Sequence, residues 1–236
     1  MSLPVINAPT YELVVPSTKE KIKYRPFLVK EEKILLLAME DGDENNISLA
    51  LKQIIENCTN GGVDVDKLAL FDLEFIFLRI RAKSVGENVK VNLLCEDDNE
   101  TYVPVEIPLE QIKVKHTKGH KNVIKLTKNI FVNMRYPQLN MMAMQAVGDT
   151  PDVERVFDIV GEWIESIVEG ETIHERVDFN DKELKEFLES LNTKQFTDIQ
   201  NFFETMPKLQ HIVEVENPKT KVMNTITLEG MQSFFD

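Results

Sequence analysis

The stretch that decides the fold is residues 66–83, DKLALFDLEFIFLRIRAK. Its apolar side chains recur at helical spacing but cover more than one stripe of the helix surface, so we expect burial on several sides. These side chains are Leu68, Phe71, Leu73, Phe75, Ile76, Phe77, Leu78 and Ile80. The pattern predicts a helix from Asp66 to about Lys83 that forms the core of the N-terminal half.

Strand and helix patterns lie on both sides of this segment. Residues 11–25 contain two short extended runs joined by a Pro-Ser-Thr turn, which is typical of a β-hairpin. Leu-rich runs predict helices over residues 31–39 and 48–58. Alternation of apolar and polar residues predicts further strands. They cover residues 89–95, 103–107, 112–114, 123–126 and 130–134.

The C-terminal half shows mainly helical patterns. Its predicted helices cover residues 139–147, 152–168, 181–191 and 194–205, before a hairpin over residues 209–227. In residues 152–168 the apolar side chains fall on one face, Asp152 is a suitable N-cap and Gly170 a suitable stop. The sequence therefore predicts an α+β fold. An α+β region, residues 1–135, has β-hairpins around a buried helix, and a helical region, residues 136–236, ends in a β-hairpin; one continuous body is the alternative.

Charge is distributed unevenly along the chain. Of 236 residues, 27 are Lys or Arg and 40 are Asp or Glu, which gives a net charge of −13. Residues 1–143 carry 20 acidic and 19 basic side chains, whereas residues 144–236 carry 20 and 8. A basic stretch without acids contains Lys113, Lys115, Lys118, Lys121, Lys125, Lys128 and Arg135. The asymmetry predicts complementary packing, between subunits or between the halves of one chain, with two solvated faces as the alternative.

Composition also excludes several classes of partner. A strongly negative chain repels polyphosphate, so we expect no nucleic-acid partner. No apolar run has the length of a membrane helix, and the first residues do not resemble a signal peptide, so we expect no membrane partner. Two cysteines, Cys58 and Cys95, cannot form a disulfide framework, and this usage is typical of a reducing compartment.

Chemically reactive residues do not assemble into a catalytic or metal-binding motif. His116 and His120 are four residues apart, but they lie in a loop with Lys and Gly and without the Glu of a zinc protease. Cys95 has Asp98 in the position where a zinc knuckle has its second cysteine. We therefore expect no cofactor, no metal and no enzymatic activity. The alternative is a metal-dependent hydrolase that uses His116, His120 and nearby acids.

Two groups of apolar residues are candidates for partner binding. Met141, Met142 and Met144 cluster near the start of a predicted helix, and flexible thioether side chains can repack against different partners. Phe234 and Phe235 place two aromatic rings at the end of the chain. Core filling is the alternative for the methionines, whereas for the phenylalanines we favour docking on the body over insertion into a partner.

Several stretches resemble one known family. They are residues 3–13, LPVINAPTYEL; residues 23–33, KYRPFLVKEEK; residues 71–87, FDLEFIFLRIRAKSVGE; and residues 228–231, LEGM, with Phe234-Phe235. Together these resemble the T4-type phage baseplate hub assembly protein family, and the likeness spans most of the chain. Some relatives carry Cys-x-x-Cys where this chain has Cys95 and Asp98, so the resemblance does not carry a metal to this chain.

The resemblance implies a role in building the baseplate hub of a contractile phage tail. The expected partners are other hub proteins and the tape-measure protein, and a homo-oligomer is also compatible. The chain would act in the host cytoplasm during assembly and in the baseplate of the virion. The alternative is a transient chaperone of the tape-measure protein that does not stay in the virion. Arg79, Arg81 and Lys83 offset the dipole at the end of the predicted central helix, and we expect them to meet acidic groups of a partner.

Overall fold

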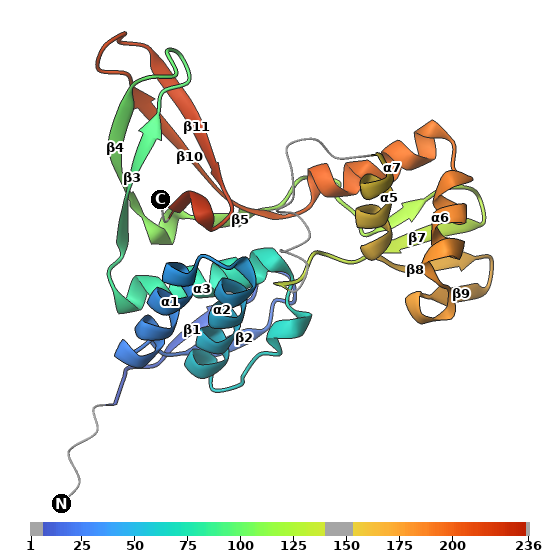
Figure 1. Cartoon of the computed structure of the whole chain (residues 1–236), viewed down its shortest axis with the longest axis horizontal. Coiled ribbons are helices and arrows are strands. Elements are labelled where there is room, and N and C mark those ends of the chain that lie inside the picture. The colour runs from blue at the N-terminus through green and yellow to red at the C-terminus, as the bar shows by residue number, and fades with distance from the viewer. Residues whose placement is uncertain (1–6, 140–152, 235–236) are drawn as a thin grey trace, which may run out of the picture. The chain divides into compact units, whose positions relative to one another are not determined.

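The computed structural model describes residues 7–139 and 153–234, and the chain forms two compact units (Figure 1). The first unit comprises the described chain up to Lys115, Gln138 and Leu139, and the described residues from Lys208 to Phe234. The second comprises His116–Pro137 and the described residues from Val153 to Pro207. Among the described residues, no helix has the length and apolar character needed to cross a membrane.

Three helices and a hairpin make up the N-terminal part of the first unit. The helices are α1 (Val29–Asp41), α2 (Glu44–Thr59) and α3 (Leu70–Ser84), and the hairpin pairs β1 (Tyr11–Val14) with β2 (Lys21–Tyr24). The single turn η1 (Val65–Lys67) precedes α3. The predicted central helix is therefore present, but it begins at Leu70 because residues 65–67 form this separate turn.

Helix α3 is buried on several sides, as its apolar pattern predicts. It contacts α2, the turn η2 (Leu109–Gln111), and the strands β5 (Lys113–Lys115) and β10 (Lys208–Glu216). Its buried residues are Phe71, Asp72, Leu73, Glu74, Ile76, Phe77, Leu78, Ile80 and Ala82. Two carboxylates are thus buried with the apolar side chains, although the apolar pattern alone does not distinguish them from exposed acids.

Two longer hairpins complete the first unit. Strand β3 (Asn88–Leu94) pairs with β4 (Tyr102–Pro108), and β10 pairs with β11 (Met223–Glu229) and with β5. Their buried side chains form one core with Leu78 and Ala82 of α3. The hairpin turns are joined by Asp97, whose Oδ1 accepts hydrogen bonds from the amides of Asn217 and Asn224, each at 2.9 Å.

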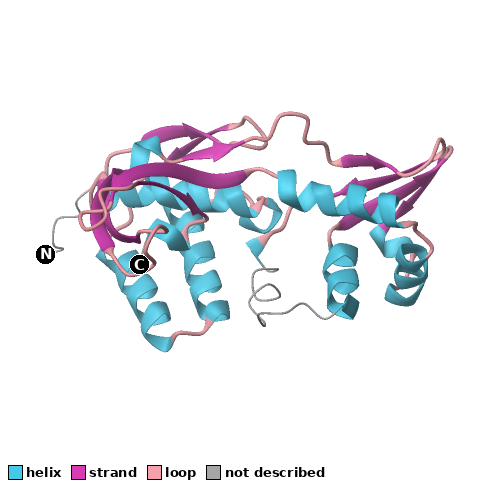
Figure 2. Ribbon diagram, turned by 90° about the horizontal axis from the view of Figure 1, so that it is seen from above, coloured by secondary structure: helices cyan, strands magenta, loops and turns pink. Residues whose placement is uncertain are grey.

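The second unit is an antiparallel sheet with helices on one face (Figure 2). The strands, in spatial order, are β6 (Val123–Lys125), β7 (Ile130–Met134), β8 (Ile164–Glu169) and β9 (Thr172–Glu175). The helices are α5 (Val153–Glu162), α6 (Asp181–Glu189) and α7 (Thr193–Thr205), and the turn η4 (Arg176–Asp178) follows β9. Ile124, Val132 and Ile167 share one face of the sheet by register, and they pack into the core with the helices.

The expectation of a helical C-terminal half is wrong. Within the predicted helix of residues 152–168, α5 ends at Glu162 and strand β8 begins at Ile164. Arg135 ends the helix, because its Nε donates to the Glu162 carbonyl at 2.9 Å and its backbone N–H donates to the Trp163 carbonyl at 2.8 Å. Beyond this point the β-branched residues pair with β7 and β9. The C-terminal part is therefore mixed helix and sheet. The predicted helix of residues 139–147 lies largely outside the described residues.

Candidate interaction surfaces

Arg79 and Lys83, which were predicted to meet a partner, make contacts inside the first unit. The Arg79 guanidinium lies 4.6 Å from the centre of the Phe75 ring and donates to the carbonyls of Leu109 at 2.9 Å and Ile112 at 2.8 Å. It therefore fastens the η2 turn to α3. Lys83 Nζ lies 2.5 Å from a carboxylate oxygen of Glu87.

Arg81 is half-buried, and burial lowers the pKa of its guanidinium while leaving it charged. Contact of any of the three cations with a partner stays a prediction.

The end of the chain docks on the body of the first unit as far as Phe234. The Phe234 ring is fully buried in the core that includes Leu78 and Leu209. The Met231 N–H donates to Glu74 Oε1 at 2.9 Å, which fixes the start of this segment on α3. Phe235, Met141, Met142 and Met144 lie outside the described residues.

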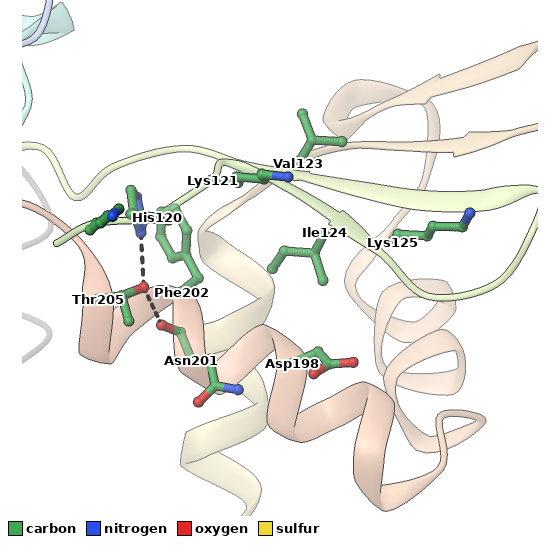
Figure 3. A pocket seen from close by; sticks show the side chains of 11 residues that line it. His120, Lys121, Val123, Ile124, Lys125, Asp198, Asn201, Phe202 and Thr205 are labelled. Atoms are coloured by element: carbon green, nitrogen blue, oxygen red, sulfur yellow. Dashed lines mark hydrogen bonds between the residues drawn. The ribbon is translucent and has the colours of Figure 1, made fainter.

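His120 has a structural role in the second unit (Figure 3). Its Nδ1 lies 2.9 Å from the Thr205 hydroxyl and its Nε2 lies 3.0 Å from the Tyr136 hydroxyl. Burial lowers the pKa of His120, so the imidazole is neutral at pH 7. Both ring nitrogens are used, and in the described part of the chain no group of three or more His, Cys, Asp and Glu residues is arranged to hold a metal ion.

A groove runs between β6 and α7 beside this histidine (Figure 3). Its volume is about 330 Å³. Its lining is part polar and part apolar. The polar residues include Lys118, Lys121, Lys125, Asp198, Asn201 and Thr205, and the apolar residues are Val123, Ile124 and Phe202. The basic stretch of the sequence thus contributes one wall of a concave surface.

Several of the exposed apolar side chains among the described residues lie on α1 and α2, which pack against each other. Leu36, Leu37 and Met39 of α1 are 59%, 55% and 53% exposed, and Leu49 of α2 is 63% exposed. We call these four residues the α1–α2 surface. Soluble proteins rarely leave such a group uncovered, and it is typical of a protein–protein interface.

The α1–α2 surface was not identified from the sequence. Four consecutive apolar residues, 34–37, cover more than half of the helix circumference, and a helix at the surface of a fold packs against that fold with one face only. Ile34 and Leu35 are half-buried, whereas Leu36 and Leu37 are exposed. The length of this apolar run was the signal available in the sequence.

A buried ion pair sets the position of α1. The carboxylate of Glu31 is fully buried, accepts from Arg25 Nη2 at 3.0 Å and accepts from the Leu28 N–H at 2.8 Å. Burial raises the pKa of Glu31, but hydrogen bonds from Arg25 and Leu28 outweigh it and hold that pKa below its usual value. The start of α1 is therefore fixed to the residue that follows β2, and the exposed leucines belong to an anchored helix.

Comparison with known protein families gives one match. The model of the family described as T4 bacteriophage base plate protein matches residues 8–236. Comparisons with curated proteins and with solved structures found no match. The family match covers both compact units and the α1–α2 surface.

Proposed function

Because the chain belongs to the T4 bacteriophage base plate protein family, we propose that it is a subunit or assembly factor of the baseplate hub. It binds other hub proteins and the tape-measure protein, first in the host cytoplasm and then in the tail baseplate. It works by surface complementarity and without catalysis. The family match supports the baseplate part of this proposal, and the exposed apolar side chains of the chain support the binding part.

The α1–α2 surface is the observation that carries the proposal. Burying a side chain such as Leu36 or Leu37 in an interface contributes about 1.5–3 kcal/mol each relative to leaving it in water. Helix α1 is held at its start by the Arg25–Glu31 pair, so little order must be gained on binding. A partner with an apolar groove or helix face fits this surface.

The test is co-purification of the chain with tail proteins encoded beside its gene, each co-expressed singly. We expect capture of a hub protein or the tape-measure protein by the native sequence and loss of capture by the double variant Leu36→Asp with Leu37→Asp. The control is Val85→Asp with Val177→Asp, because these two valines are exposed elsewhere. Equal capture by both double variants, or no capture by the native sequence, would contradict the proposal.

Quantitative mass spectrometry of purified phage separates the two forms of the proposal. A fixed copy number per tail identifies a hub subunit. Presence in assembly intermediates and absence from the finished virion identifies an assembly factor, such as a chaperone of the tape-measure protein. Absence from both would contradict either form.

A further inference from the structure

The sheet of the second unit ends in two strands of opposite charge. The order β6-β7-β8-β9 leaves one side of β6 and one side of β9 without a neighbouring strand in the described part of the chain. Lys125 lies in β6 and Lys121 two residues before it, whereas Glu175 lies in β9 and Glu171 in the turn just before it. All four side chains are exposed, and the described residues give none of them an ion pair.

The backbone of β6 offers hydrogen-bonding groups at its edge. The Asn122 carbonyl accepts from the Met134 N–H at 2.8 Å, so the even-numbered residues of this strand face β7. Backbone groups alternate in direction along a strand, and those of Val123 and Lys125 therefore face away from β7. The Val123 side chain is 53% exposed.

The backbone of β9 also offers hydrogen-bonding groups, at the opposite edge of the sheet. A two-residue loop joins β8 to β9, and Glu169 and Thr172 are the pair that closes it. Thr172 therefore faces β8, and by alternation the backbone groups of Ile173 and Glu175 face away from it. The Glu175 N–H already donates to Asp178 Oδ2 at 2.8 Å, so Ile173 is the residue whose backbone groups are open at this edge. The Ile173 side chain is 57% exposed.

The two edges match when they are brought together from two copies of the chain. Neighbouring strands of the sheet are all antiparallel and their number is even, so β9 runs opposite to β6. A second copy in the same orientation therefore presents β6 antiparallel to β9. With the exposed apolar residues opposite each other, the charged positions also align. The resulting pairs are Ile173–Val123, Glu175–Lys121 and Glu171–Lys125.

We propose that this sheet continues from one copy of the chain to the next, with β9 of one copy paired to β6 of the second. Pairing of like edges is disfavoured, because two β6 edges bring lysines together and two β9 edges bring glutamates together. The contact is therefore head-to-tail, and such contacts generate rings or open arrays. It concerns the second unit and does not depend on the partner of the α1–α2 surface.

The groove beside β6 gives independent support. In the same register, Thr172 and His174 of the second copy lie opposite Ile124 and Asn122, on the face of the sheet that packs against α7. This is the side on which the 330 Å³ groove lies, between β6 and α7 (Figure 3). The groove provides room for these two side chains.

Lysines on an edge strand also serve to prevent strand pairing. That role explains β6 alone, but it does not explain the complementary glutamates at the matching positions of β9. The two explanations differ in a measurable way, because a purely protective edge leaves the chain monomeric at every concentration and salt.

The test is sedimentation velocity of the purified full chain over a range of concentrations, at about 50 mM and about 500 mM NaCl, since salt screens exposed charge pairs. We expect association that grows with concentration at low salt and weakens at high salt. The variant Lys121→Glu with Lys125→Glu should be monomeric, and so should Glu171→Lys with Glu175→Lys. An equimolar mixture of these two variants should associate again, because each then meets an edge of opposite charge.

Two control variants distinguish association through the sheet edges from association by other routes. Lys23→Glu with Lys113→Glu changes the net charge equally on exposed residues of the first unit and should leave association intact. Val123→Pro removes an edge N–H without removing a β6–β7 hydrogen bond and should abolish association. Circular dichroism and Trp163 fluorescence check that each variant is folded. A monomeric native chain under all conditions, association that survives both charge reversals, or no rescue on mixing would overturn the proposal.

Discussion

In the first unit helix α3 is buried on several sides, whereas in the second unit the four-stranded sheet is covered by helices on one face only (Figures 1 and 2). A helix enclosed in this way carries some polar side chains into the core with it. A half-covered sheet keeps its charged residues in water and leaves two edges for pairing. The first unit is thus stabilised by burial of its central helix. The second unit is suited to contacts with other chains through the two uncovered edges of its sheet.

The enclosed carboxylates of the first unit differ in how they are compensated. Glu31 has the Arg25 guanidinium at 3.0 Å. Glu74 has the Met231 N–H as a donor, and burial raises the pKa of Glu74 to about 7 although this hydrogen bond lowers it. Glu31 is therefore charged at pH 7, whereas Glu74 is about half protonated.

The largest expected effects on the free energy of unfolding come from truncating one buried phenylalanine in the core of each unit. Phe77→Ala removes a ring that is 1% exposed in the first unit, and Phe202→Ala removes one that is 2% exposed in the second. Each should lower the free energy of unfolding of its own unit by about 3–5 kcal/mol. Both cysteines are fully buried in the first unit, and the single Trp, Trp163, is buried in the second.

Thiol labelling and Trp fluorescence in urea therefore report the two units separately. We expect Phe77→Ala to lower the midpoint of thiol exposure by about 1–2 M urea and to leave the Trp midpoint nearly unchanged, and Phe202→Ala to do the reverse. Phe75→Ala is the matched control in α3, because its ring is only partly buried and should cost about half as much. Equal shifts of both probes in both variants would show that the two cores unfold as one.

Glu74→Gln tests the buried carboxylate that a backbone N–H, rather than a guanidinium, holds. The pKa of Glu74 is about 7 in the folded state and its ordinary value is 4.5, so between these values the folded chain holds a proton that the unfolded chain has lost. The contribution of Glu74 is therefore full below about pH 4.5 and falls as the pH rises through 7. Glutamine keeps the shape, can still accept from Met231 and has no charge to bury.

We therefore expect Glu74→Gln to change stability little at pH 5 and to raise the free energy of unfolding by about 3 kcal/mol at pH 8, since one pKa unit corresponds to ~1.4 kcal/mol. The measurement is urea unfolding at both pH values, followed by thiol exposure. Glu87→Gln is the control, because Glu87 is exposed on the same unit and should show no comparable gain at pH 8. A gain of equal size at pH 5 and pH 8 would contradict the titration of Glu74.

Much of the first unit could be predicted because its signals are local. The broad apolar surface of residues 66–83 requires burial on several sides in any context, and alternation over residues 89–107 fits only a strand pair. The compensation of Glu31 could not be predicted in this way, since Arg25 reaches it from another element. The run of residues 34–37 indicated a helix, but it did not show which leucines remain exposed.

The prediction that the helix continues to residue 168 is wrong for a non-local reason. Apolar residues from Val160 to Val168 keep helical spacing, so periodicity alone continues the helix through Trp163. Arg135, far away in the sequence, ends it by binding the Glu162 carbonyl. Because residues 164–175 were not assigned to strands, the acidic edge was missed, although the basic stretch that forms the opposite edge was identified from charge.

The smallest expected effect concerns the contact between α5 and α6, where Gly161 lies close to Leu184. A Cβ on Gly161 would lie 2.8 Å from Leu184 Cδ2, which is closer than side chains approach each other. Alanine raises helix propensity by ~1 kcal/mol relative to glycine, but overpacking costs about 1–3 kcal/mol. We expect Gly161→Ala to lower the free energy of unfolding by about 1 kcal/mol, measured by Trp163 fluorescence in urea.

In the background of Leu184→Ala the clash is removed, so the same substitution should become stabilising. A double-mutant cycle shows this as a change in the sign of the effect of Gly161→Ala. If Gly161→Ala is destabilising in both backgrounds, close approach of Leu184 is not the reason for glycine at this position.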